Sequence, residues 1–130
     1  MSAVSRLDRH SDARGHLVAA TAGENVPFEI RRVFWIFGNT GGLPRAGHAS
    51  TRTTELLISV AGSCRATLDG PSGVHVVTLD RPDDSLLVPP MTWLDLSDFT
   101  ADCVLLVLAD TEYAVENSIT SLDSLRAGRA

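Results

Sequence analysis

The sequence predicts an all-β protein, a sandwich or barrel of about eight strands, from three observations. Its apolar runs are short, turn residues such as glycine and proline separate them, and a helical pattern occurs only near the C-terminus. The 130 residues, 44% of them hydrophobic, suffice to bury a core without disulfides or metal. We therefore expect one domain over residues 1–130.

In the first third of the chain, we expect two strands and a loop. "GHLVAAT" (15–21) is the first candidate strand, and "FEIRRVFWIF" (28–37) is a longer second one. The alternation of apolar and polar residues in the second strand slips at Arg31–Arg32, which predicts a β-bulge. "NTGGLPRAG" (39–47) follows, and its three glycines and one proline predict a loop.

The rest of the chain predicts six further strands and a short terminal element. The strands are "ELLISVAG" (55–62), "SCRATLDG" (63–70), "VHVVTLD" (74–80), "SLLVPP" (85–90), "TWLDLSDF" (92–99) and "CVLLVLAD" (103–110). The first two are joined at Ala61–Gly62, and the second ends at the turn signal Asp69-Gly70-Pro71. The tail "NSITSLDSLRAG" (117–128) has serine and asparagine caps, so it predicts a short helix or turn packed on the outside.

Composition narrows the partners and the compartment. The net charge of −5 argues against nonspecific nucleic-acid binding, whereas the eleven basic residues, all arginine, suit phosphate or carboxylate ligands. Cys64 and Cys103 each lie in an apolar run and are expected to be buried thiols without metal or redox roles. Neither a charged-then-apolar N-terminal signal nor a membrane-length apolar run occurs. We expect a cytoplasmic protein with no membrane partner.

Two spacings resemble the sequence marks of the small β-barrels called cupins. The first mark is H-x-H followed by a glutamate and a glycine, and the second is P-x-G-x-x-H. Alternate side chains of neighbouring strands point into one barrel mouth, which brings such residues together. The matching positions here are His48, Ser50, Glu55 and Gly62, then Pro89, Met91 and Leu94. The fold implied is a double-stranded β-helix, or jelly roll.

The metal-binding capacity of this pattern is reduced. Of the four positions that carry ligands in metal-dependent cupins, His48 and Glu55 retain a ligand, whereas Ser50 and Leu94 replace histidines. Two ligands rarely hold a first-row metal, and leucine cannot contribute. We therefore expect neither a metal nor another cofactor.

A closer resemblance covers nearly the whole chain. The segments that carry it are "DARGHL", "PFEIRRVFWIF", "PRAGHAS", "GSCRATLDG" and "DFTADCVLLVLADTEY". They are similar to the WxcM-type sugar 3,4-ketoisomerases, which are metal-free, dimeric cupins acting on dTDP-4-oxo-6-deoxyglucose. The resemblance implies a homodimer, a dTDP-sugar substrate and an isomerase activity.

The resemblance also implies site residues. His48 falls at the family's proton-shuttling histidine, with Glu55 as a second candidate for catalysis. The expected substrate-binding residues are Arg14, Arg32, Phe34, Trp35, Arg45, Ser50, Trp93 and Leu94.

Several of these positions depart from the family pattern. Ser50 stands for a second histidine, Phe34 and Trp35 for a pair of tyrosines, Glu55 for a glutamine, and Leu94 for a basic residue. Other departures are Ala46 for a glycine and Thr51 for a lysine. The changes remove proton donors and make the predicted cavity more apolar, which favours a less polar ligand.

Some assignments have a structural alternative. Arg14 and Arg32 either anchor a ligand phosphate or form ion pairs with Asp12, Glu29 and Asp95. Further alternatives are that Phe34 and Trp35 are ordinary core residues, that Glu55 forms a hydrogen bond within the barrel, that Arg45 is a solvated charge at the rim, and that His48 has no role.

Three functions remain open from the sequence. The first is a metal-free isomerase of the dTDP-4-keto-6-deoxyhexose 3,4-ketoisomerase family, working in deoxysugar or secondary-metabolite biosynthesis. It would transfer a proton next to a ketone with His48 as base. The second is a repurposed cupin that isomerises, epimerises or cyclises a non-sugar molecule. The third is a non-catalytic cupin that binds a small molecule.

Overall fold

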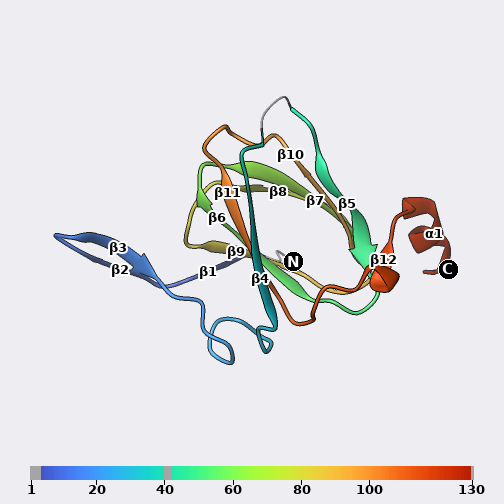
Figure 1. Ribbon diagram of the computed structural model, residues 1–130, viewed down its shortest axis with the longest axis horizontal. Coiled ribbons are helices and arrows are strands. Elements are labelled where there is room, and N and C mark those ends of the chain that lie inside the picture. Colours follow the sequence, from blue (N-terminus) through green and yellow to red (C-terminus); the bar gives the residue numbers. More distant parts are fainter. Residues whose placement is uncertain (1–3, 40–41, 130) are drawn as a thin grey trace.

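The computed structural model describes residues 4–39 and 42–129. Strands make up most of the described chain, and the helices are short (Figure 1). The strands are β1 (Val4–Arg6), β2 (Arg9–Asp12), β3 (Gly15–Val18), β4 (Arg32–Phe37), β5 (Arg45–Ser50), β6 (Glu55–Ala61), β7 (Cys64–Gly70), β8 (Gly73–Leu79), β9 (Asp84–Val88), β10 (Trp93–Ser97), β11 (Val104–Ala109) and β12 (Ser118–Ile119). The helices are the 3₁₀ turn η1 (Val115–Asn117) and α1 (Leu122–Ala127).

Two five-stranded antiparallel sheets form the body of the molecule. One has the order β1-β9-β6-β11-β4 and the other β12-β5-β10-β7-β8. The β2–β3 hairpin projects from one side of this body, and α1 lies at the opposite side (Figure 1). The predicted all-β fold with a short C-terminal helix is confirmed. None of the described helices has the length and apolar character needed to span a bilayer.

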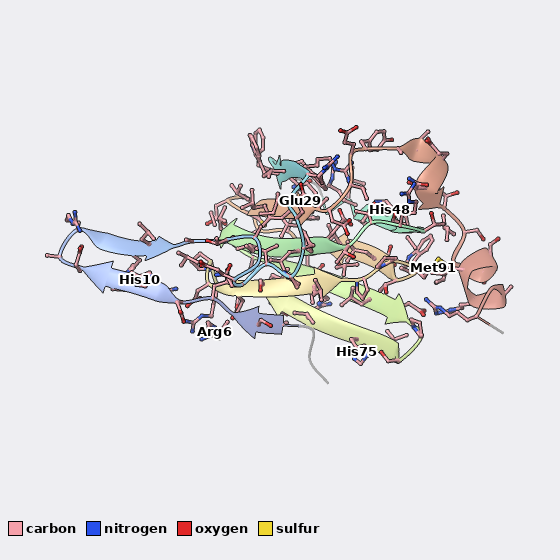
Figure 2. All side chains as sticks on the ribbon, turned by 90° about the horizontal axis from the view of Figure 1, so that it is seen from below. Arg6, His10, Glu29, His48, His75 and Met91 are labelled. Carbon is pink, nitrogen blue, oxygen red and sulfur yellow. The ribbon has the colours of Figure 1, made fainter. Side chains whose placement is uncertain are left out.

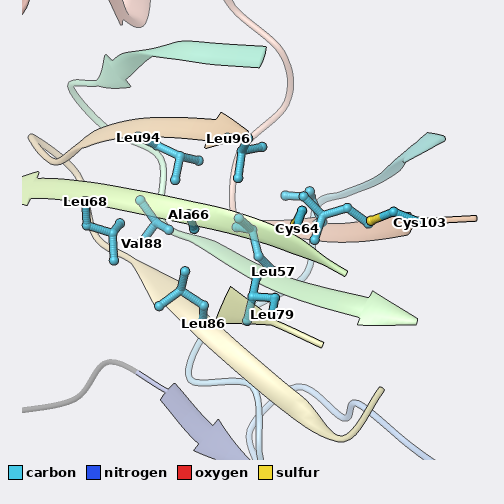
Figure 3. Close-up of a cluster of buried hydrophobic side chains, with 12 residues drawn as sticks. Leu57, Cys64, Ala66, Leu68, Leu79, Leu86, Val88, Leu94, Leu96 and Cys103 are labelled. Atoms are coloured by element: carbon cyan, nitrogen blue, oxygen red, sulfur yellow. The ribbon is translucent and has the colours of Figure 1, made fainter. Parts of the chain in front are cut away.

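The main core lies between the two sheets. Alternate residues of β6, β9 and β11 meet alternate residues of β7 and β10, as the two-residue period of a strand requires. Figure 3 shows this packing, with Leu57 and Leu86 from one sheet and Leu68, Leu94 and Leu96 from the other. This packing determines which face of each strand points inward. His48 and Glu55, two of the predicted site residues, lie where this inward face meets Leu57 and Leu94 of the core.

Smaller clusters cover the outer faces. Val26 and Leu108 belong to a cluster on the outside of the first sheet, against which Phe28 and Ile30 pack. Trp93 and Leu125 belong to another, in which α1 covers the second sheet. Two ion pairs hold the C-terminal segment to Asp69 of β7. Its carboxylate accepts from Arg126 at 2.5 Å and from Arg129 at 2.8 Å.

The first half of the chain differs from the strands predicted there. Strand β4 begins at Arg32, and its pairing with β11 continues to Phe37 without a register shift. The predicted bulge at Arg31–Arg32 is therefore wrong. The apparent slip arises because residues 28–31 precede the strand and place Phe28 and Ile30 on the outer cluster. Of the predicted first strand (15–21), only Gly15–Val18 is β-strand.

Strand β5 begins at Arg45, inside the predicted loop 39–47. Residues 40 and 41 of that loop lie outside the described residues. The structure also contains strands β1, β2 and β12, none of which was predicted. The β5 segment "RAGHAS" contains no β-branched or aromatic residue, so propensity alone did not identify it.

Candidate functional site

The open edge between the two sheets positions His48. Strand β5 pairs with β10 so that His48 lies opposite Leu94, and the register shifts between Leu94 and Asp95. Ala46 and Gly47, just before His48, both have φ of 67°. Two left-handed residues in succession produce the irregularity and set the direction in which His48 leaves the strand. Ala46 occupies the left-handed region without being glycine, a strained arrangement next to the site.

Two adjoining cavities share Phe34, His48 and Glu55, and we call them together the cleft. The outer cavity has a volume of about 440 Å³, and most of its lining residues have polar side chains. Its other lining residues are Arg32, Ser50, Thr53, Glu112, Tyr113, Ala114 and Ser118. The inner cavity, of about 230 Å³, lies against the core. Its other lining residues are Trp35, Ile36, Arg45, Ala46, Leu57, Leu94, Leu96 and Val107.

Glu55 lies at the junction of the two cavities as a half-buried acid. It begins β6 and lies opposite Ala109 of β11, which in turn lies opposite Arg32 of β4. Burial raises the pKa of the Glu55 carboxyl, and Asp110 adds to the rise, while the charge of Arg32 opposes it. A carboxyl with a raised pKa retains its proton to higher pH, so it is suited to donate a proton or a hydrogen bond.

The imidazole of His48 has no hydrogen-bonding partner among the described residues. Both ring nitrogens are therefore available to a ligand in the cleft. Ser50, two residues further along the strand, uses its hydroxyl oxygen to accept from the backbone N–H of Arg52 at 3.2 Å and of Thr53 at 3.0 Å. Its hydroxyl proton remains free to donate, so Ser50 contributes a donor to the cleft and caps the turn.

Arg32 lies between two aromatic rings. Its guanidinium carbon is 5.2 Å from the ring centre of Phe34 and 5.7 Å from that of Tyr113. Within the described residues it forms no ion pair, since Glu29 pairs instead with Arg31 at 3.5 Å and Asp95 accepts from Trp93 at 3.1 Å. The ion-pair alternative for Arg32 is therefore not what the structure shows.

The cleft gathers most of the predicted site residues, but not all. Arg14 lies on the β2–β3 turn, where it pairs with Asp12 at 2.5 Å, as the structural alternative predicted. Figure 2 shows His10 of this hairpin far from His48. Trp93 is buried under α1, outside both cavities. Trp35 lines the inner cavity, yet its side chain is 57% exposed, so it also contributes to the molecular surface.

Sequence reasoning missed four residues with polar side chains in the outer cavity: Thr53, Glu112, Tyr113 and Ser118. Three of them follow the last long strand, β11, and they reach the cleft because this segment returns to β5. The position of this segment could have predicted them, because the loops at one end of a β-sandwich converge on one site. In the described part of the chain, no three His, Cys, Asp or Glu side chains gather as metal ligands.

A jelly-roll sandwich with a histidine and a half-buried acid in a cleft at its open edge defines a protein of the cupin class. The model of the FdtA family, described as WxcM-like, C-terminal, matches residues 1–128, and the chain belongs to this family. It is 39% identical over 115 residues to the TDP-4-oxo-6-deoxy-alpha-D-glucose-3,4-oxoisomerase of Aneurinibacillus thermoaerophilus. That match covers 88% of this chain and 83% of the relative.

Solved structures of related enzymes have the same fold. The 3,4-ketoisomerase of Helicobacter canadensis superposes with a TM-score of 0.91 at 30% identity, covering 97% of this chain and 95% of that one. The sugar 3,4-ketoisomerase of Thermoanaerobacterium thermosaccharolyticum, in complex with TDP, gives 0.93 at 29% identity, covering 98% and 93%. The homologue and these structural neighbours are sugar 3,4-ketoisomerases, as the resemblance predicted.

Proposed function

We propose that this chain, acting as one domain over residues 1–130, is a metal-free isomerase that exchanges the ketone and hydroxyl of a TDP-4-keto-6-deoxyhexose between C3 and C4. The observation that carries the proposal is the cleft itself, in which a histidine side chain without a hydrogen-bonding partner and a half-buried acid line both cavities. Family membership and a 39% identical oxoisomerase support the choice of substrate.

His48 is the proposed proton carrier. It removes the proton from C3, next to the C4 ketone, which generates an enediol, and then returns a proton to C4. Atoms and electrons balance without any cofactor, since one C–H and one O–H bond are broken and remade. The free ring nitrogens of His48 and the absence of a competing hydrogen bond within the described residues suit this role.

Glu55 and the two arginines assist. The raised pKa of Glu55 lets the protonated carboxyl donate to the C4 oxygen as negative charge develops there. Arg32 and Arg45 line the outer and inner cavities and supply positive charge for anionic oxygens of the nucleotide or the sugar. Together these groups take the place of the tyrosine and histidine proton donors of the family, where this chain has Phe34 and Ser50.

A second candidate function comes from the inner cavity. Apart from Arg45, His48 and Glu55, its lining side chains are apolar, and Leu94 lies directly opposite His48. An apolar wall beside the base favours a substrate with a hydrophobic face, which supports isomerisation, epimerisation or cyclisation of a non-sugar molecule.

We also propose that two copies pair. The outward face of β4 exposes Val33, Trp35 and Phe37 by 46%, 57% and 67%. Continuous apolar exposure of this kind on an edge strand is typical of an interface. A ligand-binding role for Arg14 would require such a partner, because its hairpin projects from the body on the side away from β5, the strand that carries His48 (Figure 1). Cytoplasmic location stays a prediction.

The test begins with calorimetric titration of the protein with TDP, followed by conversion of TDP-4-keto-6-deoxyglucose monitored by NMR in D₂O. Micromolar affinity, about −8 kcal/mol, and deuterium incorporation at C3 or C4 are expected. His48→Asn should lower kcat by about 10²–10⁴-fold while TDP binding persists. His75→Asn, an exposed histidine on β8 that does not line the cleft, is the matched control and should leave kcat unchanged.

Each contrary result points to another function. No TDP binding at millimolar concentration would contradict the nucleotide-sugar substrate and favour the non-sugar cupin. TDP binding without turnover of any keto sugar would indicate a binding protein. Turnover that survives His48→Asn would remove the histidine from the mechanism.

A further inference from the structure

Tyr113 belongs to a segment that closes one side of the outer cavity. Residues 110–118 leave β11 and return to the edge of β5, where Ser118 pairs with Ser50. The Tyr113 side chain is 74% exposed and yet lines the cavity with Arg32 and Phe34. A largely exposed aromatic ring stays at the cavity only if a contact holds it there. The guanidinium of Arg32, 5.7 Å from the ring centre, supplies that contact.

The start of this segment is tied to the turn between β5 and β6. The backbone N–H of Thr54 donates to Oδ1 of Asp110 at 2.9 Å, and the Asp110 N–H donates to the carbonyl of Thr54 at 3.2 Å. The hydroxyls of Thr53 and Thr111 are 2.6 Å apart. These bonds fix the chain only two residues before Tyr113.

The end of the segment is tied to the same turn. Both the backbone N–H and the hydroxyl of Thr51 donate to the carbonyl of Asn117, at 2.8 and 3.3 Å. Tyr113 therefore lies between two anchored points, and its position over the cavity follows from backbone contacts. The placement of the ring against Arg32 is built into the fold.

This arrangement places the ring of Tyr113 against the side chain of Arg32. Its guanidinium lies between the rings of Phe34 and Tyr113, within the distance at which an arginine is attracted to an aromatic face. Its Nε is buried and has no hydrogen-bond partner. No carboxylate among the described residues forms an ion pair with it. Glu55 interacts with its charge at longer range, so the close contacts that position the guanidinium are those with the two rings.

We propose that Tyr113 is a positioning residue whose ring, opposite that of Phe34, holds the Arg32 guanidinium ready to bind the anionic diphosphate of the substrate. The inference rests on the proposed function, which supplies the diphosphate. In this arrangement the ring of Phe34 also positions Arg32, a role that needs no hydroxyl group. Ring faces orient the planar guanidinium and leave its N–H groups free, whereas a carboxylate partner would occupy them.

The experiment compares Tyr113→Leu, which removes the ring, with Tyr113→Phe, which removes only the hydroxyl. Val115→Ala is the control, since Val115 is 66% exposed on the same segment but does not line the cleft. Tyr113→Leu should weaken TDP binding by about five- to tenfold and raise KM similarly, with kcat nearly unchanged. Tyr113→Phe and Val115→Ala should bind TDP as the unmodified chain does.

A double-mutant cycle shows whether Tyr113 acts through Arg32. Lysine is a compact charge without a plane to orient, so Arg32→Lys should weaken TDP binding and abolish the further effect of Tyr113→Leu. Unchanged TDP affinity in Tyr113→Leu overturns the inference. Loss of affinity in Tyr113→Phe overturns it too, because the hydroxyl would then be the active group.

A ligand-free measurement separates this inference from the proposed function. ¹⁵N relaxation of the Arg32 Nε–H group should show a restrained side chain that becomes mobile in Tyr113→Leu and stays restrained in Tyr113→Phe. A side chain already mobile in the unmodified protein overturns the inference even if TDP binds. Failure of the unmodified protein to bind TDP contradicts the proposed function, and the relaxation data then decide whether Tyr113 positions Arg32.

Discussion

Glu55 ties the chemistry of the cleft to the stability of the fold. Burial raises the pKa of its carboxyl above the ordinary value of 4.5. Below that value the carboxyl is protonated in both the folded and unfolded chain. As the pH rises towards the raised pKa, the carboxyl ionises first in the unfolded chain. The free energy of unfolding therefore falls until the carboxyl of the folded chain also ionises. Glu55 therefore destabilises the protein at neutral and alkaline pH.

Replacing Glu55 with glutamine should remove this pH dependence. Glu55→Gln keeps the shape of the side chain and should raise the melting temperature relative to the unmodified chain at about pH 8. The gain should shrink towards about pH 4, where both side chains are neutral. Thermal unfolding across this range measures it, with the exposed Glu116→Gln as control. A gain that is independent of pH would contradict the role of burial.

Ala46 offers a second test at the level of one residue. Its φ of 67° costs an L-residue about 1–2 kcal/mol, whereas glycine adopts this conformation freely. Because glycine loses about 0.5–1 kcal/mol more backbone entropy on folding, Ala46→Gly should stabilise the protein by about 0.5–1 kcal/mol net. Urea unfolding measures the change. Ala49→Gly, on the same strand with ordinary φ, should destabilise the protein instead.

The sequence allowed part of the site to be predicted at this scale. His48, Ser50 and Glu55 were found because resemblance assigns them to two strands that share a cavity, and the structure brings them together. Trp93 was placed with them, but a residue next to an inward Leu94 must point outward, where α1 covers it. Tyr113 was missed because its position depends on backbone contacts between segments far apart in the sequence.

At the scale of elements, the turn between β6 and β7 requires glycine at position 62. Gly62 has φ of 62°, and a Cβ there would lie 2.4 Å from Oγ1 of Thr100 and 2.7 Å from the backbone nitrogen of Cys103. The turn therefore packs directly against the one that leads into β11. Because backbone is involved on both sides, neither turn can move aside without disturbing a strand.

Gly62→Ala should destabilise the protein by about 2–4 kcal/mol, from left-handed strain plus the steric clash. The matched control is Gly23→Ala, whose φ of 81° imposes the same type of strain while nothing lies within 4 Å of the added Cβ. That variant should lose only about 1 kcal/mol. Chemical denaturation of both proteins separates the two contributions, and equal losses would show that the clash is relieved.

The strands from β6 to β11 were predicted well, and those before β6 poorly. From β6 onward, glycine turns and alternating apolar residues mark each strand, because both faces of the sandwich select side chains there. The β2–β3 hairpin is exposed along nearly its whole length, so no burial pattern marks β2 in the sequence. Strand β5 carries the site, and its small and polar residues reflect that role more than strand propensity.

At the scale of the whole molecule, the surface carries large apolar side chains that are exposed in the single chain. The exposed apolar residues of β4 lie on the outer face of its sheet, where they continue a cluster that includes Ile58 and Leu108. The β2–β3 hairpin adds Leu17, which is 60% exposed on a two-stranded ribbon that forms its own sheet. Leaving this much apolar surface in water is unfavourable, and a second copy would cover it.

Phe37→Glu should therefore separate the proposed dimer. Phe37 is 67% exposed at the end of β4, and a carboxylate there would be buried unpaired, and repelled if a two-fold axis brings its copy near. Light scattering coupled to size exclusion should give twice 13.9 kDa for the unmodified chain and 13.9 kDa for the variant. Val76→Glu, on β8 with 61% exposure, should remain a dimer. A monomeric unmodified chain would contradict pairing and leave Arg14 without a cleft to reach.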